Sequence, residues 1–196
     1  VYGCVLGYDL IADEMKDKEL SELVKRIGLV EGMPVVTNPG IIDPEKFADE
    51  VINVRIPNPF MPDTPQRIAT DTSQKVGIRY GETIKSYVAK DGSARALTAI
   101  PLAIAGWCRY LLGIDDNGEA FELSPDPMAD ELKCQLDGIV WGESSSYTGQ
   151  LKNLLSNANI FGINLYEAGI GDKIEEMFVE EISGKGAVRE TLKKYF

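Results

Sequence analysis

The sequence contains no histidine. This absence removes the side chain that most often serves as an acid or base near neutral pH and as a zinc ligand. It also excludes a Ser-His-Asp arrangement within the chain. Neither a G-x-G-x-x-G loop after a strand, nor a G-x-x-x-x-G-K-S/T loop, nor a G-x-S-x-G elbow occurs. The chain therefore has no recognisable cofactor loop and no obvious acid–base group of its own. Gly169 and Gly171 are only an isolated glycine pair.

Cysteine is scarce, with Cys4, Cys108 and Cys134 widely spaced and no C-x-x-C pair. An odd number of distant cysteines predicts reduced thiols that pack as small apolar side chains, in a cytoplasmic setting. Long hydrophobic runs are missing too. The longest, Ala99–Gly106, contains Pro101 and is too short for a membrane span. No signal-peptide pattern is present. We therefore expect no membrane partner.

Basic residues are outnumbered, with 20 Lys and Arg against 31 Asp and Glu, giving a formal net charge of −11 and a pI near 4.5. Phosphate backbones and anionic membrane surfaces would repel such a chain, so nucleic acid is an unexpected partner. Hydrophobic residues make up 44% of the 196 residues, which predicts a folded core rather than disorder. The chain begins at Val1 inside an apolar run, as a domain cut from a longer protein would.

One stretch, residues 55–75, combines prolines with cations. Its first half contains Pro57, Pro59, Pro62 and Pro65, which forbid a regular helix there. Pro65 suits the first turn of a helix, and Thr72 or Ser73 can cap the next one, which we expect to continue to about residue 89.

The same stretch supplies Arg55, Arg67 and Lys75. Arg67 and Lys75 are eight positions apart, about two helical turns, so they can share a face. The functional interpretation is a basic pocket wall for a hydroxylated or carboxylated substrate. The structural interpretation is a rigid connection whose cations pair with the protein's own carboxylates. We expect Arg55 and Asn58 to be structural, because a proline-bounded loop must satisfy its backbone groups.

The rest of the chain reads as helices. Apolar spacing and capping residues predict the ranges 1–15, 18–30, 44–55, 94–112, 127–137, 147–156, 171–182 and 187–196. The range 94–112 is apolar around most of its circumference, so we expect it to be the buried central helix, kinked at Pro101. Residues 157–165 are predicted to form an apolar connection. In residues 119–123 polar and apolar side chains alternate, as they would in a short strand.

Two acidic segments invite a metal interpretation. Residues 113–118 lack the twelve-residue spacing and closing Glu of a calcium loop, so a plain turn is predicted. The acidic residues of the helix near 171–182 are interpreted as a solvated face rather than a metal cluster; they are Glu175, Glu176, Glu180 and Glu181. No metal site is expected.

Two motifs resemble the polyol-specific long-chain dehydrogenases, the family of mannitol 2-dehydrogenase and fructuronate (mannonate) reductase. The first motif comprises Asn58-Pro59, Asp63, Arg67-Ile68, Asp71, Ser73 and Lys75. The second comprises Ala105-Gly106-Trp107-Cys108-Arg109-Tyr110, Gly113 and Asp126-Pro127. The similarity spans most of the chain. Ile56 stands where the family usually has Phe.

The resemblance implies that residues 1–196 are a mainly α, single helical domain. It would be similar to the C-terminal substrate domain of mannitol dehydrogenase, which is like the C-terminal domain of 6-phosphogluconate dehydrogenase. An N-terminal Rossmann domain that binds NAD(P), and the catalytic Lys, would precede Val1. The resemblance further implies that Arg67 and Lys75 bind substrate hydroxyls, while no catalytic, cofactor-binding or metal-binding residue lies in this chain.

The function implied is that of an oxidoreductase domain acting on a sugar alcohol or aldonate and its keto form, mannitol/fructose or mannonate/fructuronate. The partners would be that substrate and the protein's own N-terminal domain. The chain by itself would be inactive. The alternative is a non-catalytic helical interaction or dimerisation module.

Overall fold

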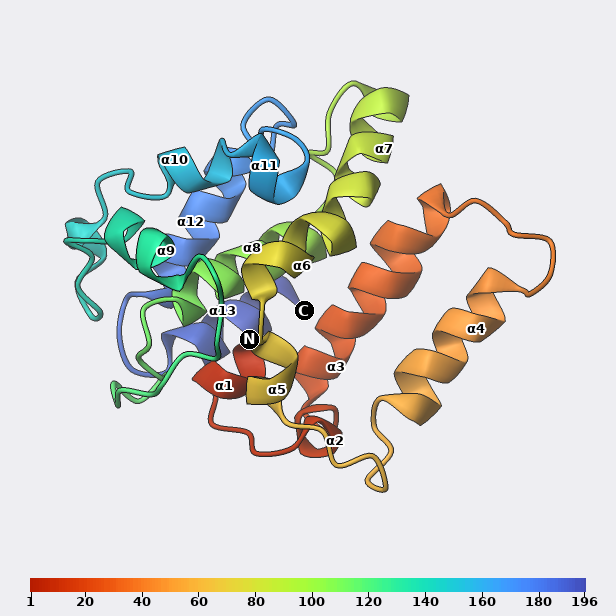
Figure 1. Cartoon of the computed structure of the whole chain (residues 1–196), viewed down its shortest axis with the longest axis horizontal. Coiled ribbons are helices and arrows are strands. Elements are labelled where there is room, and N and C mark those ends of the chain that lie inside the picture. Colours follow the sequence, from red (N-terminus) through yellow and green to blue (C-terminus); the bar gives the residue numbers. More distant parts are fainter.

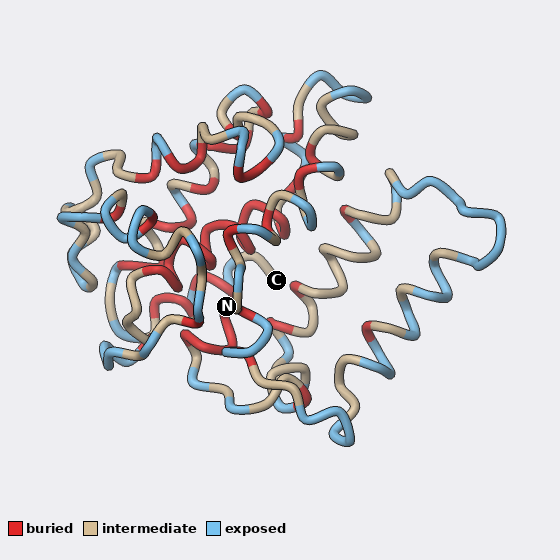
Figure 2. Tube along the Cα trace, viewed as in Figure 1, coloured by how far each residue is buried: buried red, intermediate tan, exposed pale blue.

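Helix α8 (Ala99–Tyr110) runs through the middle of the structure, and other helices pack around it (Figure 1). The computed structural model describes all residues 1–196, and every residue of α8 is buried. Trp107 is 1% exposed, which confirms the prediction of a central core helix. Figure 2 places most of the buried trace in this part of the molecule. The helix is shorter than the predicted 94–112, because residues 94–98 form a bonded turn before it.

A carboxylate from a distant part of the chain caps the start of α8. The oxygens of Glu31 accept hydrogen bonds from the backbone N–H groups of Thr98 (2.6 Å), Ala99 (2.7 Å) and Ile100 (2.8 Å). These N–H groups have no partner inside the helix. A negative charge at this end of the helix also interacts favourably with the positive end of the helix dipole. Pro101 is the third residue of α8, where its missing N–H breaks no helical bond. The predicted kink at Pro101 is therefore wrong.

The N-terminal residues form two short helices, α1 (Tyr2–Val5) and α2 (Ile11–Glu14), where one helix over 1–15 was predicted. Gly7 lies between them with a φ of 77°. Glycine adopts this left-handed conformation without the strain that a side chain brings, and it ends helices for that reason. The apolar spacing continues across Gly7, so periodicity alone did not reveal the break.

Residues 18–62 form an arm that projects from the helical body (Figure 1). Its elements are α3 (Lys18–Lys25), η1 (Arg26–Gly32), η2 (Met33–Val35), α4 (Pro44–Glu50) and η3 (Val51–Arg55). The side chains of Asp17 and Asp43 cap α3 and α4, where helices starting at 18 and 44 were predicted. Figure 2 colours the arm mostly as intermediate or exposed. Its exposed large apolar side chains are Val30, Val36, Ile41, Ile42, Phe47, Val54, Phe60 and Met61.

Four consecutive elements connect the arm to the body: α5 (Pro65–Ala69), α6 (Thr72–Val76), η4 (Gly77–Gly81) and α7 (Glu82–Asp91). The second half of the chain adds α9 (Ala129–Gln135), η5 (Ser144–Ser146), α10 (Lys152–Leu155), α11 (Ala158–Phe161), α12 (Gly171–Glu181) and α13 (Ala187–Tyr195). Helix α10 is much shorter than the predicted 147–156, and the predicted connection 157–165 contains α11. The predicted strand 119–123 is reduced to one isolated bridge between Ile114 and Ala120.

The acidic turn after α8 has a structural role. Carboxylate oxygens of Asp116 accept hydrogen bonds from the backbone N–H groups of Val188 (2.9 Å) and Arg189 (3.2 Å), at the start of α13. Asp115 accepts from Asn117 and Glu119 within the turn. The structure contains no cluster of acidic or cysteine side chains arranged to hold a metal ion.

One expectation about α12 is wrong. Glu181 was grouped with the solvated glutamates, but its side chain is fully buried. It lies near Arg109, which is also fully buried and donates hydrogen bonds to the carbonyl oxygens of Glu181, Ile114 and Asp115. Because Arg109 is satisfied by backbone oxygens, it joins three segments of the core. None of the helices has the length and apolar character needed to span a bilayer.

Candidate functional site

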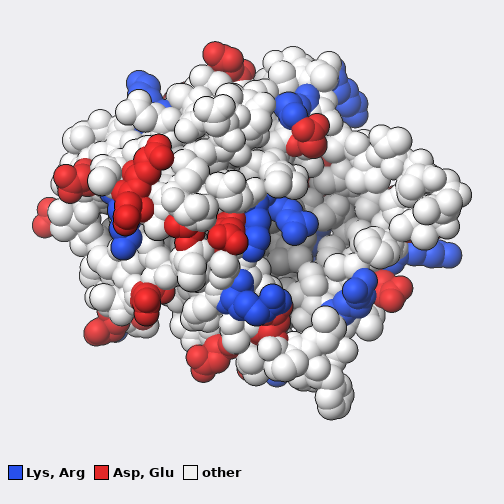
Figure 3. Space-filling view, in the orientation of Figure 1, with Lys and Arg blue, Asp and Glu red and all other residues white.

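A cavity of about 620 Å³ opens where α5, α6 and η4 face α8 and the first residue of the chain. Its lining residues are Val1, Ile27, Asp63, Arg67, Ile68, Ala69, Thr72, Lys75, Val76, Arg79, Tyr80, Ala103 and Trp107. Figure 3 shows basic side chains gathered around a hollow between the body and the arm. The cavity thus has an apolar floor and a rim that carries most of its charge.

Helix α5 places Arg67 at this rim. The helix begins as predicted, with Pro65 in its first turn and the Thr64 hydroxyl accepting a hydrogen bond from the Arg67 N–H (3.2 Å). Four residues earlier, Asp63 receives two hydrogen bonds from the Arg67 guanidinium, one of them from Nε at 2.5 Å. These hydrogen bonds hold the pKa of Asp63 below its usual value and raise the pKa of Arg67. Two N–H groups of Arg67 are therefore used, and the other three remain available.

Helix α6 places Lys75 at the same rim. Its ammonium donates to the carbonyl oxygens of Ile68 (3.3 Å) and Thr70, across the turn that joins α5 to α6. An ammonium has three hydrogens, so one donor remains free. Arg67 and Lys75 thus face one cavity beside Val1, although each also bonds within the chain. Both sequence interpretations, the pocket wall and the internal pairing, describe part of this arrangement.

The turn between α5 and α6 is built by contacts that the sequence did not predict. Asp71 precedes α6 with a φ of 54°, the only positive φ outside glycine. The carboxylate of Asp126 accepts hydrogen bonds from the Ser73 N–H (2.8 Å) and hydroxyl (2.5 Å). The predicted cap by Thr72 or Ser73 is therefore wrong: a residue 53 positions away caps α6. This cap fixes the start of the helix that carries Lys75.

Arg55 and Asn58 do not line the candidate cavity. The Asn58 side chain accepts a hydrogen bond from the Phe60 N–H (3.0 Å), which confirms a structural role within the proline-rich loop. Arg55 lines a neighbouring apolar groove with Phe47 and Met61. Among the cysteines, Cys4 and Cys108 are buried as expected, whereas Cys134 is exposed.

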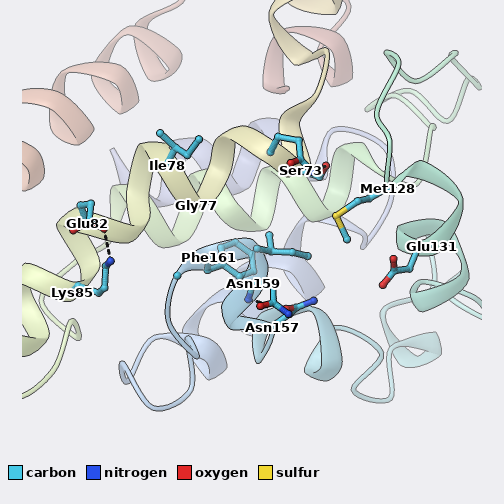
Figure 4. A pocket seen from close by; sticks show the side chains of 13 residues that line it. Ser73, Gly77, Ile78, Glu82, Lys85, Met128, Glu131, Asn157, Asn159 and Phe161 are labelled. Carbon is cyan, nitrogen blue, oxygen red and sulfur yellow. Dashed lines mark hydrogen bonds and ion pairs between the residues drawn. The ribbon is translucent and has the colours of Figure 1, made fainter.

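A second cavity, of about 680 Å³, lies on the other side of α6 and η4 (Figure 4). There Gly77 and Gly81 let η4 approach α11 so closely that a β-carbon at either position would overlap a backbone carbonyl. The only cation of this cavity, Lys85, pairs with Glu82. Glu131 adds a further negative charge. With its cation paired, this cavity offers little for an anionic or hydroxyl-rich ligand, and we take the cavity of Arg67 and Lys75 as the candidate site.

Two residues of the candidate site were not predicted as site residues from the sequence. Asp63 was named only as a member of the first motif, and Arg79 was not named. Both lie four residues from a predicted site residue, Asp63 before Arg67 and Arg79 after Lys75. Spacing of four residues places side chains on one helical face, and this signal was available in the sequence.

Comparison with known proteins gives consistent matches. Residues 1–182 match the family model of the mannitol dehydrogenase C-terminal domain. A D-mannonate oxidoreductase of Thermotoga maritima is 55% identical over 99% of this chain and 36% of its own length. A D-mannonate oxidoreductase of Escherichia coli is 30% identical over 67% of this chain and 26% of its own. The chain thus spans about a third of the first of these relatives and about a quarter of the second.

Among solved structures, the ternary complex of Pseudomonas fluorescens mannitol 2-dehydrogenase with NAD and D-mannitol superposes with a TM-score of 0.78. The two chains are 21% identical, and the match covers 98% of this chain and 36% of the other. At that identity the match establishes the fold, which confirms the predicted helical domain.

Proposed function

The chain belongs to the mannitol dehydrogenase C-terminal domain family, and we propose that it is the substrate-binding domain of a nicotinamide-dependent oxidoreductase. The reaction would interconvert a sugar alcohol or an aldonate with its keto form. The 55% identity to a D-mannonate oxidoreductase favours the mannonate/fructuronate pair over mannitol/fructose. NAD(P) and an N-terminal Rossmann domain belong to the same proposal, as does a cytoplasmic location.

The observation that supports this proposal is the meeting of Arg67 and Lys75 on one cavity beside Val1. They come from two different helices, α5 and α6, joined by a turn that Asp71 and Asp126 hold in place. Both side chains carry free donors and no acceptor, so they suit hydroxyl, carbonyl or carboxylate oxygens of a substrate.

In the proposed reaction these two residues would bind and orient the substrate. Three N–H groups of Arg67 and one of Lys75 are not used within the chain, so a substrate can take them without breaking an internal bond. Holding the reacting carbon in a fixed place lowers the entropic cost of reaction. The apolar floor, formed by residues such as Ala103 and Trp107, keeps water from the underside of the cavity. The nicotinamide, when bound, supplies or accepts the hydride.

The glycine pair Gly169 and Gly171 does not suit a nucleotide phosphate. Gly171 is the first residue of α12, and a helix N-terminus can hold a phosphate. However, the ring of Tyr166 covers Gly171 so closely that a β-carbon there would overlap it. The glycine makes room for an aromatic ring rather than for a phosphate. We therefore assign the cofactor to the proposed N-terminal domain and no residue of this chain to it.

The experiment is steady-state kinetics of the full-length protein with NADH and D-fructuronate or D-fructose. Arg67→Ala and Lys75→Ala should each reduce kcat/KM by about 1.5–3 kcal/mol of transition-state stabilisation, the typical worth of hydrogen bonds from charged groups. The unfolding midpoint should change little, because the Arg67 side chain is 72% exposed. Arg95→Ala, an exposed arginine outside the cavity, is the matched control. Unchanged kinetics in both variants would refute the site.

The alternative, a helical interaction or dimerisation module, is favoured by one observation. The arm exposes eight large apolar side chains, including Phe60 at 92% exposure, and apolar surface of this kind often marks an interface. Light scattering of the purified chain across concentration tests it. A concentration-dependent dimer that Phe60→Ser abolishes would support the module.

A further inference from the structure

Arg79 lines the same cavity as Arg67 and Lys75, but it has no partner. None of the ion pairs of the chain includes it. Arg67, by contrast, is paired with Asp63, and Lys75 donates to two carbonyl oxygens. All five N–H donors of the Arg79 guanidinium are therefore available to a ligand.

The charges around the cavity do not balance. Its lining contains three cations and one carboxylate, which gives a local charge of 3 − 1 = +2, whereas the whole chain carries −11. The single carboxylate, Asp63, is already used by Arg67. Lys75 and Arg79 thus stand four residues apart without a counter-ion, and like charges at this spacing repel each other. A neutral polyol would leave this repulsion in place, whereas an anionic ligand would relieve it.

We propose that Arg79 binds the carboxylate of a sugar-acid substrate and so selects an aldonate or its keto acid over a neutral polyol. The proposal rests on the proposed function, since it concerns the same cavity. A guanidinium matches a carboxylate with two parallel N–H···O hydrogen bonds, a geometry that an ammonium cannot supply. Arg67 already uses its Nε–Nη fork and its charge on Asp63, whereas the Arg79 guanidinium has no carboxylate beside it. In this arrangement Arg67 and Lys75 bind hydroxyl or carbonyl oxygens of the substrate, and Arg79 binds its carboxylate.

The first experiment compares two substrates in the full-length protein. We expect Arg79→Ala to lower kcat/KM for D-fructuronate about 10- to 100-fold, the range for a charged hydrogen-bonded pair. The value for D-fructose should stay within about twofold, and Arg79→Lys should recover part of the loss. The control Arg95→Ala should change neither. Equal losses with both sugars would overturn the proposal. So would a rise in the KM of NADH alone, which would assign Arg79 to a phosphate of the nucleotide.

The second experiment does not depend on turnover. Phenylglyoxal modifies accessible arginines, and peptide mass spectrometry follows each site. We expect D-mannonate, but not D-mannitol, to slow the modification of Arg79 and to leave Arg95 unchanged. Absence of protection by D-mannonate would overturn the proposal. A wild-type protein that reduces neither sugar would refute the proposed function, while selective protection of Arg79 would still support sugar-acid binding here.

Discussion

The hydroxyl of Tyr2 lies 2.5 Å from Oε1 of Glu181 and 2.7 Å from the carbonyl oxygen of Leu102. A phenol has one hydrogen, so it can donate to only one of these two acceptors. A protonated Glu181 supplies the second hydrogen. Burial raises the pKa of Glu181 to about 8, against the partly opposing effects of the Tyr2 hydrogen bond and Arg109. The core thus contains a carboxyl group that keeps its proton near neutral pH.

This pair predicts that stability falls as pH rises. The unfolded chain releases the Glu181 proton near pH 4.5, whereas the folded chain keeps this proton up to a pH of about 8. Between these values the folded state binds more protons, so the free energy of unfolding decreases with increasing pH. At about 1.4 kcal/mol per pH unit, the difference gives at most about 5 kcal/mol.

Urea unfolding of wild type and Glu181→Gln at pH 5 and pH 8.5 tests this prediction. The amide stays neutral, so the variant should lose much of the pH dependence and be relatively more stable at pH 8.5. Glu176→Gln, an exposed residue of the same helix, should behave as wild type. Parallel pH profiles for wild type and Glu181→Gln would contradict a buried, protonated Glu181.

The cap of α8 predicts a second loss of stability. Glu31→Ala leaves three N–H groups, those of Thr98, Ala99 and Ile100, without their acceptor. We expect a loss of about 2–4 kcal/mol, because buried donors that lose charged partners are costly. Glu31→Gln keeps one acceptor and should lose less. Glu45→Ala on the exposed α4 is the control, and an equal effect of both alanine variants would argue against the cap.

Replacing the largest side chain of the core is also expected to lower the free energy of unfolding. Trp107→Ala should cost about 3–5 kcal/mol, because it empties a large site at the centre of α8. The ring packs edge-on against Phe161, with centroids 6.0 Å apart and an interplanar angle of 79°. Trp141→Ala removes a partly exposed indole and should cost less. Chemical denaturation measures both, and an unchanged midpoint in Trp107→Ala would be incompatible with this packing.

The chain by itself should show no turnover. NADH oxidation with D-fructose or D-fructuronate, measured on the purified 196-residue chain, should equal a buffer blank. The physical reason is that the proposed function assigns the substrate-binding donors to this chain and the nucleotide site to another domain. Turnover well above the blank would overturn the assignment of cofactor binding to another domain.

The sequence by itself predicted the helical class, the core helix around Trp107 and the candidate pair Arg67 and Lys75. The candidate pair rests on its spacing of two helical turns together with the family resemblance, whereas the class and the core helix rest on local signals: the apolar circumference of residues 99–110 and the caps and prolines at helix starts. Such signals act between residues near each other in the chain, so one sequence is enough to read them.

The tertiary structure alone decided how α6 and α8 begin and which charges are buried. Glu31 caps α8 from 67 residues away, and Asp126 caps α6 from 53 residues away. Glu181 lies inside the core on a helix whose other glutamates meet solvent. No local pattern encodes these contacts, because a carboxylate is stabilised by whatever donors the packed chain brings to it. The same packing leaves Arg79 without a counter-ion beside two cations that the sequence had already singled out.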